Sequence, residues 1–174
     1  MNVLFVCTGN ICRSPTAERL ALAEAARLEL PSFTAHSAGT RAVIGHDLHE
    51  EAARVVERLG GDTTRFAARQ LSSKIAAPAD LILTMTRSHR DAVLEVIPYK
   101  LNATFTMREA YLLVTELGAS AVGELAAARP RLTSISDGAL DIPDPIGQSA
   151  EVFLEVGTQI SGLLGPILGL CRDR

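Results

Sequence analysis

The sequence is poor in cysteine and carries no strong charge of either sign. Its 174 residues include only three cysteines, Cys7, Cys12 and Cys171. That is too few for the disulfide framework of a small secreted protein, so we expect a reducing compartment and a cytoplasmic location. The net charge of -3 gives no overall positive field. Nucleic acid is therefore not an expected partner, and any phosphate must be bound by a local site.

Signals for export, membrane insertion and metal binding are also lacking. No basic residue precedes the apolar run from Val3 to Cys7, which is far too short for a signal sequence or a membrane span, so we expect no export. The apolar stretch from Val152 to Leu170 is broken by Glu155, Gln159 and Pro166, and we interpret it as a packed terminal helix with no membrane partner. The four histidines show no metal-ligand spacing with cysteines or carboxylates. We expect no metal and no other cofactor, and the oligomeric state is left open.

Short apolar runs alternate with helical patterns along the chain. Strands are expected at 1–7, 32–37, 80–85 and 103–106, and helices at 14–30, 46–59, 87–96, 109–128 and after residue 147. Ser14 and Pro15 suit the N-cap and the first position of the first helix. Strands that alternate with helices imply right-handed crossovers. We therefore predict one α/β domain over residues 1–174, with a doubly wound, four-stranded parallel sheet and helices on both faces.

The turn after the first strand has the composition of a phosphate-binding loop. Ligands of doubly wound folds bind at the carboxyl ends of the strands, and here that place is the stretch from Cys7 to Ser14, where Gly9 is expected to permit the turn. Backbone N–H groups at the start of a helix can surround an anion, and Arg13 can donate two parallel hydrogen bonds to a phosphoryl group. The residues predicted to bind the substrate phosphate beside Arg13 are Thr8, Gly9, Asn10, Ile11, Cys12 and Ser14.

Cys7 has the setting of a nucleophile toward phosphorus. A thiol at a helix N-terminus beside a guanidinium is stabilised as its anion, so we expect Cys7 to be a thiolate at neutral pH. Its attack on phosphorus would form a cysteinyl-phosphate intermediate and divide one hydrolysis into two displacements. Ser14 is spaced to donate its hydroxyl hydrogen to the Cys7 sulfur. The leaving oxygen needs a proton, for which a long loop at 129–144 offers Asp141 and Asp144.

Together these residues resemble the low-molecular-weight protein tyrosine phosphatase family. The stretch from Cys7 to Pro15 resembles its signature loop, and segments 37–40, 68–71, 80–85 and 144–145 match in the family's order. The resemblance implies a phosphoric monoester hydrolase that acts on phosphorylated proteins, with Cys7 as nucleophile and Arg13 as phosphate clamp. It also implies Asp144 as general acid and base, because the family's acid directly precedes a proline, here Pro145. Asp141 is then expected to face solvent.

Several positions depart from the tyrosine phosphatase pattern. Ile146 and Gly147 stand where the family usually has aromatic residues, and Phe66 stands where its central loop usually has a supporting histidine. Thr86 with His89 instead resembles the bacterial protein arginine phosphatase branch. These departures point away from a typical phosphotyrosine pocket.

Ile11 points in the opposite direction. Arginine phosphatases carry threonine at that place, where a hydroxyl can orient a phosphoguanidinium, whereas isoleucine gives an apolar wall suited to an aromatic ring. We therefore predict hydrolysis of phosphotyrosine, with protein arginine phosphatase activity by the same mechanism as the alternative.

Further residues are expected to support the loop and the acid. Asn10 and Ser37 are predicted supports, because short polar side chains hydrogen-bond the backbone of strained turns. Pro145 is expected to stiffen the setting of the acid. Cys12 is close enough in sequence to form a reversible disulfide with Cys7, which would protect the nucleophile from over-oxidation.

Two rival functions use the same loop. Thioredoxin-coupled arsenate reductases resemble it as well, but they pass electrons through two further cysteines, and none lies between Arg13 and Leu170. A non-catalytic phosphoanion-binding module would need neither a thiolate at Cys7 nor an acid at Asp144. Both rivals are therefore disfavoured.

Overall fold

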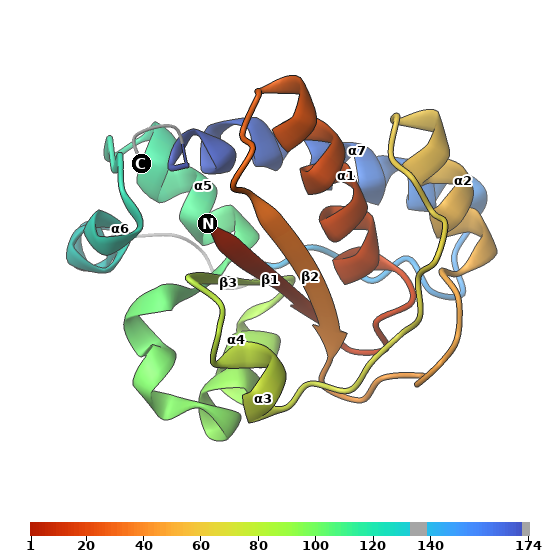
Figure 1. The fold of residues 1–174 in the computed structure, drawn as a ribbon, viewed down its shortest axis with the longest axis horizontal. Helices are drawn as coiled ribbons and strands as arrows, with labels where there is room; N and C mark the ends of the chain where they lie inside the picture. The colour runs from red at the N-terminus through yellow and green to blue at the C-terminus, as the bar shows by residue number, and fades with distance from the viewer. Residues whose placement is uncertain (133–138, 172–174) are drawn as a thin grey trace.

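The computed structural model describes residues 1–132 and 139–171, which form a four-stranded parallel sheet between helices. The strands are β1 (Asn2–Cys7), β2 (Thr34–Gly39), β3 (Leu81–Thr84) and β4 (Thr104–Thr106), in the order β2-β1-β3-β4 (Figure 1). The predicted strands and the doubly wound α/β architecture are confirmed. That residues 1–174 form one domain stays a prediction.

The helices follow the predicted alternation with the strands. They are α1 (Arg13–Arg27), α2 (Glu50–Arg58), α3 (Ser73–Ala76), α4 (Arg87–Val96), α5 (Met107–Thr115), α6 (Val122–Ala128) and α7 (Ala150–Gly169), with short 3₁₀ helices at Pro98–Ala103 and Arg129–Arg131. The stretch 109–128, expected to hold one or two helices, contributes to α5 and α6. The sequence did not indicate α3 and the 3₁₀ helices, because a single turn has no apolar periodicity. Part of the loop expected at 129–144 lies outside the described residues.

Both faces of the sheet are buried, and successive residues of β1 point to opposite faces. Val3, Phe5 and Cys7 belong to the core cluster that α1, α5 and α7 complete. Leu4 and Val6 belong to a second cluster, formed with α3 and α4. Figure 1 shows these two helical layers above and below the strands. Cys7 therefore ends β1 on the face that α1 covers.

The first helix begins one residue earlier than the sequence indicates and lacks the predicted cap. α1 starts at Arg13, and its N-cap residue, Cys12, makes no side-chain hydrogen bond to the helix. Ser14 lies inside the first turn, fully buried, with its hydroxyl beside the sulfur of Cys7. The prediction that Ser14 caps the helix was wrong, because the phosphate-binding loop uses that hydroxyl.

α7 is long and apolar, and it packs against α1. By length and composition it is the one helix among the described residues that could cross a membrane. Its residues Val156, Ile160 and Leu164 are nevertheless buried in the same core cluster as residues of α1. This packing agrees with the prediction of a packed terminal helix.

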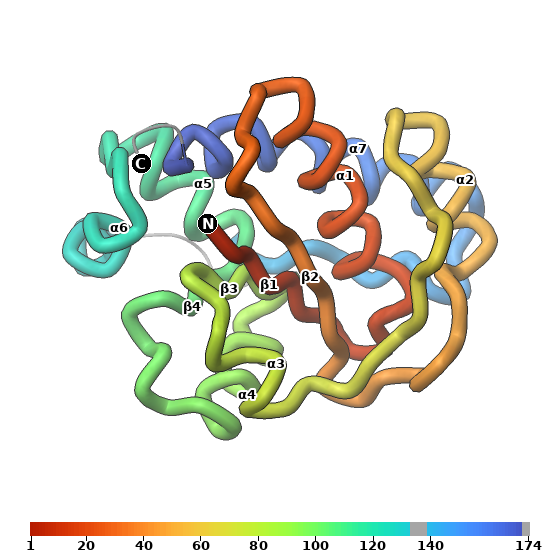
Figure 2. The backbone as a smooth tube through the Cα atoms, viewed as in Figure 1, coloured from red at the N-terminus to blue at the C-terminus, as the bar shows by residue number. Residues whose placement is uncertain are grey.

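Three segments distant in sequence meet at the carboxyl ends of β1 and β2 (Figure 2). The chain leaves β1 through residues 8–12 and enters α1, while residues 40–49 leave β2 and lead to α2. Residues 60–72 return along the same side, where Gly39 pairs with Gln70 in an isolated parallel bridge. The turn after β1 is thus enclosed by two later segments.

Candidate active site

The loop after β1 is held by its carbonyl groups, which leaves its N–H groups unpaired. The bonds come from the segment after β2, with Thr40 N–H donating to the Cys7 carbonyl (2.9 Å), Arg41 to Thr8 (3.0 Å), Val43 to Gly9 (2.9 Å) and His49 to Ile11 (2.7 Å). Within 1–132 and 139–171, the backbone N–H groups of residues 8–13 have no acceptor. Unpaired N–H groups at the start of a helix attract an anion. The loop therefore has the geometry of a phosphate cradle.

This loop borders a cavity of about 280 Å³. The cavity is lined by Cys7, Thr8, Gly9, Ile11, Cys12, Arg13, Arg41, Val43, Asp144 and Ile146. It brings the predicted nucleophile, phosphate clamp and acid together. Arg41 and Val43 were not identified from the sequence, because only the fold brings the segment after β2 to the mouth of the loop.

Asn10, rather than Gly9, adopts the unusual backbone conformation of the loop. Its φ of 55° lies in the left-handed region, which asparagine tolerates better than most residues. Its amide donates to Ser14 Oγ (3.0 Å) and Ser37 Oγ (2.8 Å) and accepts from the N–H of Arg69 (2.8 Å). A Cβ at Gly9 would make only ordinary contacts, at 3.5 Å and 3.6 Å. The expectation that Gly9 permits the turn was wrong, since the buried contacts of Asn10 fix it.

A polar network continues from Asn10 to the central segment 62–72. Ser37 Oγ donates to Glu18 Oε2 (2.5 Å), and Arg69 Nε donates to the Ser37 carbonyl (2.8 Å). Phe66, at one of the positions that depart from the family pattern, is buried in an apolar cluster with Leu48, Val56 and Ala68. Arg69 therefore supplies polar contacts to the loop, although an arginine in a polar stretch gives no sequence signal of such a role.

The sulfur of Cys7 lies 2.9 Å from Ser14 Oγ. Ser14 Oγ accepts a hydrogen bond from the Asn10 amide, and its own hydrogen can go to the sulfur or to the carbonyl oxygen of Ala38, which lies farther away at 3.5 Å. Cys7 is 2% exposed and lines the cavity. A thiolate at this position would be stabilised by the Ser14 hydroxyl and by the start of α1.

Cys12 lies in a different electrostatic setting. Burial raises the pKa of the Cys12 thiol to about 12, with further contributions from Cys7 and Asp144 and an opposing one from Arg13. Cys12 is therefore a neutral thiol at neutral pH. Both loop cysteines are free, and their reversible disulfide stays a prediction.

Arg13 connects the loop to the segment 141–147. Its Nη1 donates to the carbonyl of Ile142 (3.1 Å), and its Nη2 forms an ion pair with Asp144. Arg13 is 5% exposed, and its Nε has no acceptor among the described residues. A buried guanidinium N–H without a partner is costly, and a phosphoryl oxygen in the cavity would provide one.

The two candidate acids have different surroundings. Asp141 accepts a hydrogen bond from the N–H of Arg87 at the start of α4 (2.8 Å), and its side chain is only 32% exposed. The expectation that Asp141 faces solvent was therefore wrong, because its carboxylate anchors the segment to α4. Asp144 accepts from the N–H of Ile146 (3.2 Å) and is 47% exposed at the cavity. Asp144 is thus the carboxyl group that a substrate can reach.

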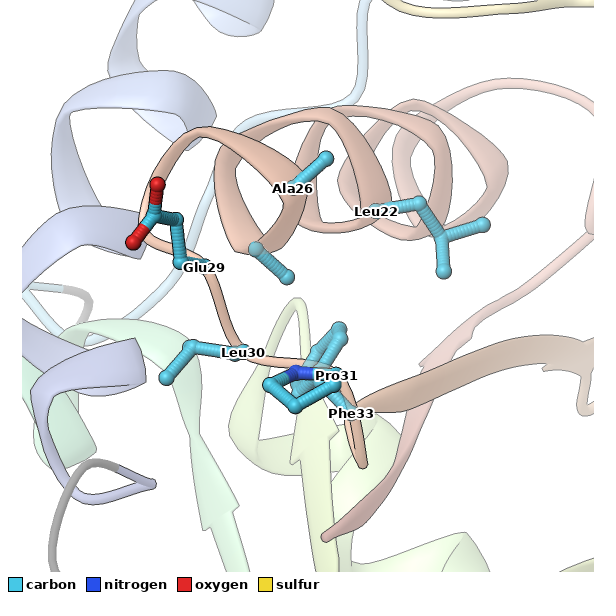
Figure 3. Close-up of a pocket in the computed structure, with 7 residues that line it drawn as sticks. Leu22, Ala26, Glu29, Leu30, Pro31 and Phe33 are labelled. Atoms are coloured by element: carbon cyan, nitrogen blue, oxygen red, sulfur yellow. The ribbon is translucent and has the colours of Figure 1, made fainter.

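A larger cavity, of about 450 Å³, lies at the opposite end of α1. Figure 3 shows mainly apolar side chains around it, including Leu22, Leu30 and Phe33, with Glu29 as the charged residue. It has neither a nucleophile nor a cation among its lining residues. In the part of the chain that the structure describes, no group of three or more His, Cys, Asp or Glu residues is arranged to hold a metal ion.

The sequence of this chain is similar to one family of phosphatases. Residues 2–118 match the family model "Low molecular weight phosphotyrosine protein phosphatase". The chain is 37% identical over 106 residues to the low molecular weight protein-tyrosine-phosphatase Ptp of Acinetobacter johnsonii, which covers 61% of this chain and 71% of that relative. Matches to some other curated relatives cover 61% to 64% of their length.

Solved structures of two kinds share the fold. A low molecular weight protein tyrosine phosphatase from T. tengcongensis has a TM-score of 0.76 and 30% identity, covering 97% of both chains. The YwlE arginine phosphatase from Geobacillus stearothermophilus has a TM-score of 0.72 and 28% identity, covering 95% of this chain and 89% of that one. The structural neighbours therefore include both a tyrosine phosphatase and an arginine phosphatase.

Proposed function

The chain belongs to the low molecular weight phosphotyrosine protein phosphatase family, and we propose that it removes phosphate from phosphotyrosine in proteins through a cysteinyl-phosphate intermediate at Cys7. One observation carries this proposal. A single cavity is lined by Cys7, Arg13 and Asp144 around a loop whose N–H groups are unpaired within the described residues. These groups supply the nucleophile, the anion site and the proton donor that phosphoryl transfer requires.

Substrate binding changes the partner of Arg13. In the structure, the guanidinium uses Nη2 for Asp144 and leaves Nε without an acceptor. A phosphoryl group seated on the loop N–H groups offers oxygens to both nitrogens, in the bidentate geometry that guanidinium favours. Asp144 is thereby released from the ion pair and becomes free to hold a proton beside the leaving oxygen.

The chemistry then proceeds in two displacements. The Cys7 thiolate forms a sulfur–phosphorus bond while the bond from phosphorus to the tyrosine oxygen breaks, and Asp144 gives its proton to that oxygen. Water next attacks phosphorus, Asp144 takes the proton from the water, and the sulfur–phosphorus bond breaks to release phosphate and regenerate the thiolate. The Ser14 hydroxyl, 2.9 Å from the sulfur, stabilises the thiolate when it leaves.

The mouth of the cavity supports phosphotyrosine as the substrate. Ile11, Val43 and Ile146 line it, and the last two are 39% and 45% exposed. These side chains provide apolar walls for a ring, although the usual aromatic residues are missing. Arg41 adds an exposed guanidinium whose side chain has no hydrogen-bond or ion-pair partner among the described residues. Its charge would oppose the guanidinium of a phosphoarginine.

Protein arginine phosphatase activity is the second candidate. It is favoured by the hydrogen-bonded pair Thr86 and His89, of which His89 also contacts Thr8 of the loop, and by the YwlE arginine phosphatases among the structural neighbours. The same cysteine, arginine and aspartate would serve both reactions, so the apolar and charged groups at the mouth decide between them.

We also propose a cytoplasmic location and phosphorylated proteins as partners. A mechanism that depends on a reduced Cys7 fits the cytoplasm, and the substrates are phosphorylated proteins. We include neither nucleic acid nor a membrane among the partners, since the net charge is -3 and the apolar face of α7 is packed in the core.

Phosphate release from a phosphotyrosine peptide and a phosphoarginine peptide of matched sequence tests the proposal. We expect faster release from phosphotyrosine and no catalytic release by the Cys7→Ser variant. Faster release from phosphoarginine would move the protein to the second candidate. Undiminished release by Cys7→Ser would refute the mechanism for either substrate.

A further inference from the structure

His89 is hydrogen-bonded to the phosphate-binding loop. It is in the first turn of α4, is 7% exposed, and places Nε2 at 2.8 Å from Thr8 Oγ1. Its other ring nitrogen, Nδ1, is 2.9 Å from Thr86 Oγ1. A continuous hydrogen-bonded chain thus runs from the N-cap of α4 to the residue that follows Cys7.

The contacts of Thr86 determine which atoms donate and which accept along these hydrogen bonds. Thr86 Oγ1 accepts a hydrogen bond from the backbone N–H of His89 (3.2 Å), and its own hydrogen has no other acceptor among the described residues. Donation of that hydrogen to Nδ1 places the ring hydrogen on Nε2, which then donates to Thr8 Oγ1. The hydrogen of the Thr8 hydroxyl is left free, and Thr8 lines the cavity with Cys7 and Arg13.

The surroundings of His89 keep its ring neutral. Burial lowers the pKa of His89 to about 4, and the charges of Arg13 and Arg41 act in the same direction. Asp144 and Asp141 oppose the shift but do not reverse it. The ring is therefore a neutral donor at the pH of the reaction, and it brings no additional charge to the anion site.

We propose that His89 is a positioning residue, which is oriented by Thr86 and holds the Thr8 hydroxyl so that its hydrogen is directed at a phosphoryl oxygen. The inference rests on the proposed function. It adds one side-chain donor to the backbone N–H groups and the guanidinium, and it gives Thr8 a role beyond its backbone. A fixed donor of this kind stabilises developing charge without reorganisation.

A double-mutant cycle between Thr8→Val and His89→Leu tests the inference. The readouts are kcat/KM for an aryl phosphate and the Kd of inorganic phosphate from calorimetry. We expect each single variant to lose roughly 10- to 100-fold in kcat/KM, as for a hydrogen bond to a charged group. The double variant should lose no more than the worse single variant, because Thr8→Val removes the donor and His89→Leu removes the contact that orients the same donor.

Two further variants separate positioning from a merely structural role. His89→Gln offers a side-chain N–H toward Thr8 and should recover part of the loss, whereas His89→Asn reaches only Thr86 and should not. His36→Gln, at an exposed position on β2, is the control and should leave both readouts unchanged. If His89→Leu does not fold, His89→Asn takes its place in the cycle.

The outcomes distinguish this inference from the proposed function. Losses that multiply in the double variant, or equal losses in His89→Gln and His89→Asn, would overturn the positioning role even if phosphotyrosine is hydrolysed. A coupled loss of phosphate affinity in a protein that releases no phosphate from phosphotyrosine peptide would uphold the positioning role and refute the proposed function.

Discussion

Cys7 and Cys12 share one loop but are expected to react differently. Cys7, the proposed nucleophile, lines the cavity with its sulfur 2.9 Å from the Ser14 hydroxyl, whereas burial raises the pKa of the Cys12 thiol to about 12. Since only the thiolate is alkylated, iodoacetamide at pH 7 should modify Cys7 first, and peptide mass spectrometry would locate the adduct. Inorganic phosphate should slow the reaction. Alkylation of Cys12 ahead of Cys7 would contradict the assignment of the nucleophile.

Ile11 is the residue at which substrate choice can be tested most simply. Ile11→Thr replaces part of the apolar wall of the cavity by a hydroxyl. We expect the ratio of kcat/KM for phosphotyrosine over phosphoarginine peptide to fall by about 10-fold or more, as for the loss of apolar contacts together with the gain of a polar one. Ile11→Val, which keeps an apolar wall, is the matched control. An unchanged ratio in Ile11→Thr would show that specificity lies elsewhere.

The functional residues within the loop could be predicted from the sequence, whereas the residues that contact the loop from distant positions could not. Cys7 and Arg13 were identified because their spacing in one loop is itself the signal. Arg69 and His89 reach the loop from positions 59 and 81 residues away from their partners, and nothing in a single sequence indicates such pairings. Asn10 was expected to support the loop, yet the turn itself was attributed to Gly9, because glycine is the usual residue for tight turns.

Among the elements, the junction of β2 with the phosphate-binding loop depends most on the absence of a side chain. A Cβ at Gly39 would lie 2.4 Å from the carbonyl oxygen of Thr8, which is closer than atoms can approach. Gly39→Ala should therefore lower the free energy of unfolding by about 1–3 kcal/mol and reduce kcat. To make room for the added methyl group, the backbone at Thr8 must move, and this would displace the phosphate-binding loop.

Gly162→Ala is the control for this prediction. A Cβ at Gly162 meets nothing within 4 Å in α7, so alanine there should stabilise the helix by about 0.5–1 kcal/mol and leave activity unchanged. Denaturant unfolding and steady-state kinetics on both variants measure the difference. Equal stability of the two variants would contradict the close approach described for Gly39.

Strands and long helices were predicted well because their apolar periodicity is local. The helix at Arg87–Val96 has the predicted bounds, and the strand ends differ from the predicted ones by at most two residues. The helix expected from His46 instead begins at Glu50, because His49 serves as its N-cap and donates its N–H to the Ile11 carbonyl. Tertiary contacts with the loop, which a single sequence does not reveal, thus set that boundary.

The burial of His89 as a neutral ring predicts that the folded protein loses stability in mild acid. Its pKa is about 4 in the folded protein against an ordinary 6.5, so the unfolded chain binds a proton first as the pH falls. This contribution to stability is complete above pH 6.5 and is lost progressively down to about pH 4, by up to about 3 kcal/mol. Unfolding by urea across this range, compared between the protein and His89→Gln, measures it. Parallel stability curves for the two proteins would contradict a buried neutral imidazole.

The architecture followed from the sequence because strand and helix signals alternate, and alternation leaves few topologies for a parallel sheet. The placement of the site followed as well, since the turn after the first strand lies at the carboxyl end of the sheet. The residues that form the walls of the cavity could not be predicted, because Arg41, Val43 and Ile146 come from segments that only the folded chain brings to that turn.

The proposed cysteinyl-phosphate mechanism is tested most directly by trapping the intermediate on Cys7. The protein is mixed with excess phosphotyrosine peptide, quenched in denaturant within the first turnover, and digested for mass spectrometry. Nucleophilic catalysis by Cys7 predicts one phosphoryl group on the peptide that contains Cys7. In a Cys12→Ser variant, the phosphoryl group should still be found on Cys7. Phosphate release at the full rate with the phosphoryl group on another residue, or on none, would contradict this mechanism.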